Sequence, residues 1–263
     1  MEKENSRKLI EERSYKIVKA NRLIQESRFN LSLQEQKIIL YLISKIKPDQ
    51  MYFDEHEFEI QEFCKICGID HTNGGNYEYV KKTLKDLRDK SLWVQEGKSE
   101  ILLAWIDTVV ITKDSGTVKI AINDRMKPYL LQLQEQFTSY ELYYILAMRS
   151  QYSVRLYELL KSYEYKKGVI IAIEDFKRSM MVEKYGRFPD LRRYVIEPAI
   201  KEINSVSDIN VTWEPLKQGR KYNRLKFVVT GKKNISERAA TWERIENILN
   251  PAQQSLFDEE TIS

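Results

Sequence analysis

The sequence predicts an α+β protein in which one small fold occurs twice in tandem. Three pairs of segments support this duplication, because the partners share their apolar spacing and lie about 106 to 117 residues apart. Each copy is predicted to contain, in order, a helix, a strand, two helices and a β-hairpin. That order is typical of a winged helix, a helix-turn-helix with a hairpin beside its last helix. We therefore predict two tandem winged-helix domains related by internal duplication.

The first element of each copy is predicted to be a helix that opens with a capping box. Ser32 is followed three residues later by Glu35, and Thr138 is followed in the same way by Glu141. In this motif the hydroxyl and the carboxylate each accept a backbone N–H at the start of the helix. Apolar residues at helical spacing follow in both segments, FNLSLQEQKIILYLI and QFTSYELYYILAM.

The second pair of segments is FEIQEFCKICGI and IAIEDFKRSMMV. Phe63 occupies the place of Phe176, an acidic residue precedes each, and Ile69 occupies the place of Val182. Each segment is predicted to be a short strand that runs into a helix.

The third pair is predicted to supply the last helix of each copy, followed by a strand. The helix within 77–94 has an apolar stripe of Tyr77, Val80, Leu84 and Leu87. Its counterpart, which starts just before the stretch 192–211, has a stripe of Leu191, Val195, Ala199 and Ile203. Pro198 removes one backbone donor and presses on the carbonyl four residues earlier. We expect a bend there rather than a break, because the apolar stripe continues past the proline.

Hairpins complete the two copies, with turns at Asp114–Gly116 and around Gln218–Gly219. A final helix is expected over 236–250, ending before Pro251. The predicted organisation is an N-terminal arm, a first winged helix, a second winged helix, and a helical and acidic tail, with the bounds 1–28, 29–133, 134–235 and 236–263.

Composition excludes several classes of protein. The 263 residues contain no apolar run long enough to cross a membrane, and the first residues lack the apolar core of a secretion signal. Two cysteines indicate a reducing compartment, so a cytoplasmic location is expected. The formal charge of +4 is uneven, since 177–233 holds 14 Lys and Arg against 6 Asp and Glu, a net of +8. Such a segment suits a polyanion, most commonly nucleic acid, although a solvated basic face is the plainer alternative.

Three segments resemble the Rep_3 family of plasmid replication initiators: NRLIQESRFNLSLQEQKIILYLISKI, SQYSVRLYELLKSY and RRYVIEPAIKEINSVSDINV. The resemblance covers nearly the whole chain except its last 30 residues. It implies a monomer that binds repeated origin sequences, called iterons, and a dimer, formed through the first domain, that represses the protein's own gene. It also implies the host replication initiator and helicase as partners.

The resemblance makes 190–204 the helix that recognises DNA in the second domain. Arginine can bind guanine through two hydrogen bonds, and either basic residue can bind phosphate. The candidates on and just before this helix are Arg187, Arg192, Arg193 and Lys201, and those on the hairpin are Lys217, Arg220, Lys221, Arg224 and Lys226. The first domain offers Lys81, Lys82, Lys85 and Arg88, offset by Asp86 and Asp89, so weaker DNA contact is expected there.

The tail contains a candidate peptide for the bacterial sliding clamp. Gln253, Leu256 and Phe257 fit part of the usual form Q-L-x-L-F, although Gln254 stands where Leu is usual. The alternative is that Leu256 and Phe257 pack on the protein's own domain.

Other motifs carry little weight. Gly97–Ser99 lacks the earlier glycine of a phosphate-binding loop and is expected to be a turn between strands. Cys64 and Cys67, with His56 and His71 near them, have zinc-like spacing, but the repeat places both cysteines inside an ordinary helix.

We expect no metal, no cofactor and no catalytic activity. Two alternatives to an initiator are a winged-helix transcription regulator and a nicking enzyme, which would need paired histidines.

Overall fold

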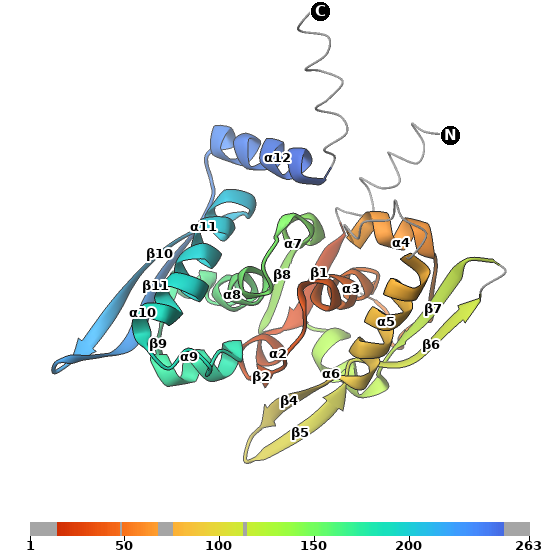
Figure 1. Ribbon diagram of the computed structural model, residues 1–263, viewed down its shortest axis with the longest axis horizontal. Helices are drawn as coiled ribbons and strands as arrows, with labels where there is room; N and C mark the ends of the chain where they lie inside the picture. The colour runs from red at the N-terminus through yellow and green to blue at the C-terminus, as the bar shows by residue number, and fades with distance from the viewer. Residues whose placement is uncertain (1–14, 48, 68–75, 113–114, 250–263) are drawn as a thin grey trace, which may run out of the picture. The chain divides into compact units, whose positions relative to one another are not determined.

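The computed structural model describes residues 15–47, 49–67, 76–112 and 115–249 (Figure 1). The chain forms two compact units, one of Met1–Leu142 with Glu174–Lys184 and one of Tyr143–Ile173 with Tyr185–Ser263. Among the described residues, no helix is both long enough and apolar enough to cross a membrane.

The first unit contains three small antiparallel sheets and the helices that pack on them. Its helices are α2 (Asn21–Gln25), α3 (Leu33–Ser44), α4 (Ile60–Cys67), α5 (Asn76–Asp89), α6 (Lys127–Leu130) and α9 (Ile173–Met180). Its strands are β1 (Lys16–Ala20), β2 (Ser27–Arg28), β3 (His56–Glu59), β4 (Ser91–Glu96), β5 (Ser99–Ala104), β6 (Ile106–Thr112), β7 (Thr117–Ile122) and β8 (Phe137–Glu141). The sheets have the strand orders β2-β4-β5, β3-β7-β6 and β1-β8.

The predicted capping box at the start of α3 is confirmed. The Ser32 side chain accepts the backbone N–H of Glu35, and the Glu35 carboxylate accepts the backbone N–H of Ser32 at 2.6 Å. That carboxylate is almost fully buried and also binds Lys90 Nζ at 2.7 Å. Glu35 therefore joins the start of α3 to the residue just before β4.

The second unit is built on one three-stranded sheet, in the order β10-β11-β9. Its strands are β9 (Gly168–Ala172), β10 (Ile209–Gln218) and β11 (Lys221–Gly231), and its helices are α7 (Leu142–Ala147), α8 (Gln151–Lys161), α10 (Phe188–Leu191), α11 (Glu197–Val206) and α12 (Ile235–Leu249). The core face of β11 consists of Leu225, Phe227 and Val229, all buried. α12 matches the expected tail helix over its described length.

Gly168 is required where β9 meets β11. Its φ is +138°, and a Cβ built there would lie 2.1 Å from the carbonyl oxygen of Phe227. Only a residue without a side chain permits this backbone conformation and this close approach.

The duplicated fold is confirmed by matching strand connections. β3 pairs with β7, and β9 pairs with β11, so in both copies the strand before the second helix joins the last strand of the hairpin. That second helix begins at Ile60 in one copy and at Ile173 in the other, and Phe63 and Phe176 are fully buried. Ile69 lies outside the described residues.

The expected helix cap at Thr138 is wrong. Thr138 lies in β8, opposite Lys19 of β1, and its hydroxyl donates to Asn21 Oδ1 at 2.6 Å. Pairing with β1 keeps this segment extended, so its capping pattern starts no helix at that point. The first long helix of the second copy is α8, where the Ser150 side chain accepts the backbone N–H of Tyr152.

The structure describes part of the two motifs that carry little weight as functional sites, the turn at Gly97 and the Cys/His group. Gly97 has a φ of +61° in the tight turn between β4 and β5, as expected. Cys64 lies buried inside α4, and burial raises the pKa of its thiol to about 11. The side chain of Cys67 and all of His71 lie outside the described residues.

Candidate nucleic-acid interface

One helical run of the second unit presents basic side chains to solvent. It comprises α10, a π-helical turn at Arg192–Ile196, and α11. Its inner face is the predicted stripe of Leu191, Val195, Ala199 and Ile203, all buried. Its outer face exposes Arg192, Arg193 and Lys201. Arg187 precedes α10, is highly exposed and lies 3.5 Å from the Asp190 carboxylate.

Pro198 is accommodated by widening the helix. It lies at the first turn of α11, immediately after the π turn, where the backbone N–H of Glu197 donates to the carbonyl of Arg192, five residues earlier. Pro198 has no backbone N–H to donate, but no regular row of α-helical hydrogen bonds is interrupted there, because the π turn has already replaced the α-helical bonding pattern. The sequence predicted a bend rather than a break at this point. The run is not broken, since a single π turn joins α10 to α11, and the bend itself stays a prediction.

Arg192 is held on two sides. Its Nε donates to Glu197 Oε1 at 2.7 Å, and its guanidinium carbon lies 5.9 Å from the centre of the Trp213 ring on β10. A cation over an aromatic face at this distance is attracted by the ring. Both Arg192 and Glu197 remain about half exposed, at 55% and 45% of the side chain.

The hairpin of β10 and β11 is a basic wing (Figure 1). Gly219 has a φ of +64° in its turn, a conformation that glycine adopts without strain. Four predicted residues are exposed along its tip, namely Lys217, Arg220, Lys221 and Arg224. The fifth, Lys226, is half-buried and pairs with Glu214 at 2.7 Å.

An aromatic cluster ties the wing to the helical run. The ring of Phe188 in α10 lies 5.1 Å from that of Tyr222 and 6.5 Å from that of Trp213. Lys217 Nζ lies 5.1 Å from the centre of the Tyr222 ring. Sequence reasoning missed Phe188 and Trp213, because their contacts cross from one element to another. It also missed Glu197.

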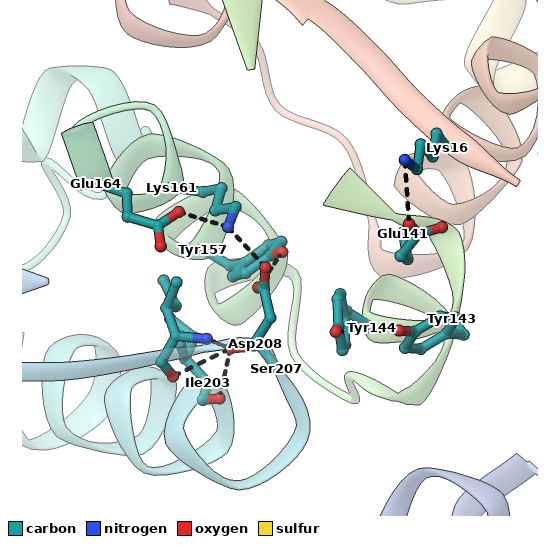
Figure 2. A network of polar contacts seen from close by, with 11 residues as sticks. Lys16, Glu141, Tyr143, Tyr144, Tyr157, Lys161, Glu164, Ile203, Ser207 and Asp208 are labelled. Atoms are coloured by element: carbon teal, nitrogen blue, oxygen red, sulfur yellow. Dashed lines mark hydrogen bonds and ion pairs between the residues drawn. The ribbon is translucent and has the colours of Figure 1, made fainter. Parts of the chain in front are cut away.

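A partly buried polar network fixes the start of β10 (Figure 2). Asp208 accepts hydrogen bonds from Lys161 Nζ at 2.6 Å and from the Tyr157 hydroxyl at 2.8 Å, and Lys161 also pairs with Glu164. Burial by itself would lower the pKa of Lys161, but the charges and hydrogen bonds of Asp208 and Glu164 outweigh it and raise the pKa. Lys161 therefore stays charged, and the network joins α8 to the strand that leads into the wing.

In the first unit, the predicted basic residues lie on the exposed side of α5: Lys81, Lys82, Lys85 and Arg88. Two of them have partners there. Lys85 Nζ pairs with the Asp89 carboxylate at 2.5 Å, and Arg88 Nε donates to the Asp107 carbonyl at 2.7 Å. The surface is thus less free to bind a polyanion than the second unit's helix and wing.

The fold defines a tandem winged-helix protein that carries basic side chains on the exposed face of the last helix in each copy. Residues 16–161 match the family described as "Initiator Replication protein, WH1", and 172–229 match "Initiator Rep protein, WH2". The chain belongs to this family of replication initiators, which confirms the resemblance seen in the sequence.

Curated relatives and a solved structure agree with this assignment. A "Replication initiation protein" from Escherichia coli is 26% identical over 225 residues, which are 81% of this chain and 69% of the relative. The "PI protein" from Escherichia coli is 28% identical over 152 residues, and this chain spans about half of its length (50%). The fold matches the crystal structure of the Pi initiator protein in complex with iteron DNA, with a TM-score of 0.67 and 21% identity over 84% of this chain and 99% of that one.

Proposed function

We propose that this protein initiates plasmid replication by binding iterons, the directly repeated sequences of an origin, chiefly through its second winged helix. The observation that carries the proposal is the joined surface of the helical run and the wing. There, Arg192 and Arg193 stand exposed on the helical run, beside a hairpin with four exposed basic residues at and next to its tip. Membership of the initiator family, and a fold like that of an iteron-binding initiator, support this proposal.

The chemistry divides between the two elements. The run 188–206 enters the major groove, where its outer arginines meet base edges and Lys201 meets phosphate. The wing lies along the backbone or the minor groove, where its positive charge displaces condensed counterions. The first winged helix makes the secondary contact through Lys81 and Lys82, and it forms the dimer that represses the protein's own gene.

The host replication initiator and helicase are the proposed partners at the origin, and no bond is broken by this protein itself. The sliding clamp is a further proposed partner, through Gln253, Leu256 and Phe257, which lie outside the described residues. Changing Leu256 and Phe257 to Ala in the full chain should abolish binding to purified clamp. Unaltered clamp binding would remove this partner and leave iteron binding untouched.

Footprinting of the purified protein on the DNA flanking its own gene tests the main proposal. Regular protection of direct repeats, with one protomer on each repeat, is the expected result. Protection of one palindrome would identify a transcription regulator instead. A folded protein that protects nothing would show that the basic surface serves another ligand.

A further inference from the structure

The carboxylate of Glu197 stands within the basic surface of the helical run. It is about half exposed, bonded to Arg192, and four residues before Lys201 on the same side of α11. An acid at this place repels the phosphates that the surrounding bases attract. Its presence in a DNA interface therefore needs a compensating role.

The π turn explains how Glu197 reaches Arg192. Residues five apart lie about 140° from each other around an ordinary α-helix, which places their side chains on different faces. Here the backbone N–H of Glu197 bonds to the carbonyl of Arg192, so the two residues are one turn apart and their side chains meet at 2.7 Å. Pro198 follows at once, and it favours this wide turn because an ordinary helix would press its ring on the Tyr194 carbonyl.

The contacts of Arg192 leave one edge of its guanidinium available. Nε donates to Glu197, and the guanidinium carbon lies 5.9 Å from the centre of the Trp213 ring, which in turn packs on Phe188. The two terminal nitrogens take no part in the bond to Glu197. Their paired N–H groups match O6 and N7 of guanine, the commonest specific contact in the major groove.

We propose that Glu197 is a positioning residue that determines sequence specificity: through the π turn it holds Nε of Arg192, so that the terminal nitrogens read a guanine in the iteron. This inference rests on the proposed function, namely DNA binding by this run. A neutral Arg–Glu pair attracts phosphate weakly, whereas reading of a base edge depends on geometry and hydrogen bonds. Arg192 therefore contributes to specificity more than to the salt dependence of binding.

The test compares full-length variants on two DNA probes. The unaltered protein first selects its best site from a random duplex library. Affinity for that site and for random duplex is then measured over a range of salt, for Arg192→Ala, Glu197→Gln, the double variant and Glu214→Gln. Glu214 is the matched control, because it is another exposed acid paired with a base at 2.7 Å, on the wing.

Arg192→Ala should lower the ratio of specific to random binding by roughly 5- to 150-fold, with the loss confined to one guanine position. Glu197→Gln should lower the same ratio by at least about fivefold, although it removes a negative charge and raises the affinity for random duplex. In the Arg192→Ala background the Glu197 change should have no further effect on the ratio, because it acts through that arginine. Glu214→Gln should raise both affinities equally.

Three results would overturn the inference. First, Glu197→Gln could raise the affinities for the specific site and for random duplex in parallel, like the control. Second, in the Arg192→Ala background it could change the base preference at a cytosine position, which would make Glu197 a direct base reader. A library with no enriched site for the unaltered protein would refute sequence-specific DNA binding, and the inference with it. Pro198→Ala gives a second approach, since an ordinary helical turn would separate the pair and should reproduce the loss in specificity with random binding retained.

Discussion

Neutralising the tip of the wing should change how strongly salt weakens DNA binding. The variant replaces Lys217, Arg220, Lys221 and Arg224 with Gln, leaving the buried base of the hairpin unaltered. Each phosphate contact contributes about 0.9 to the slope of log affinity against log salt, so four contacts contribute about 3.6. Between 50 and 200 mM salt, a fourfold change, the unaltered protein should lose about 150-fold more affinity than the variant.

The assay is fluorescence anisotropy on random duplex at several salt concentrations, because phosphate contacts do not depend on sequence. Lys166→Gln is the control, because it removes one exposed charge far from the turn of the wing. Lys166 lies just before β9, whose first residue, Gly168, pairs with Val228 in the part of β11 away from the turn. The control should keep the slope of the unaltered protein. An unchanged slope in the fourfold variant, with normal folding by circular dichroism, would exclude the wing from the interface.

Three predictions concern the stability of the fold. Gly168→Ala should lower the free energy of unfolding by about 1–3 kcal/mol in urea titrations, because φ is positive and the new Cβ would lie 2.1 Å from the Phe227 carbonyl oxygen. Gly186→Ala is the control: its Cβ would meet open space, so the free energy of unfolding should change by less than about 1 kcal/mol. Asp208→Asn leaves Lys161 short of one charged partner and should cost about 1–3 kcal/mol in the same assay, and an unchanged midpoint would contradict the role of the network. Burial raises the pKa of Cys64 from a usual 9.0 to about 11. The neutral thiol therefore stabilises the fold fully below pH 9, and this contribution is lost as the pH rises to 11. Across that range, the difference in free energy of unfolding between the unaltered protein and Cys64→Ala should shrink.

Local patterns in the sequence predicted most of the fold. The capping box of α3 and the apolar stripes of α5 and of the last helix depend on residues three or four apart, and the chain alone reveals them. The equivalent motif at Thr138 failed because a strand from residues 16–20 competes for the same segment. Such pairing between distant segments leaves no mark in a local pattern.

The candidate site could be predicted only as a list of charges. The basic residues of the helix and wing are evident in the sequence, but the way Glu197 holds Arg192 depends on a π turn. Ordinary helical periodicity places these two residues on different faces. The packing of Phe188 against Trp213 and Tyr222 depends on how the wing folds back toward the helix, which spacing along the chain does not give.

The pairing of β10 with β11 also bears on how such a protein can acquire a new DNA target. Leu216 faces Arg224, but Lys217 faces Tyr222, so Asn223 is an extra residue that forms a bulge. The bulge separates a base, whose inner face is buried, from a solvent-exposed tip, and Arg224 lies just on the base side of it. Residues can be exchanged or inserted at the tip without shifting the register of the base, so selection can alter the DNA contacts of the wing while the hydrophobic core stays the same.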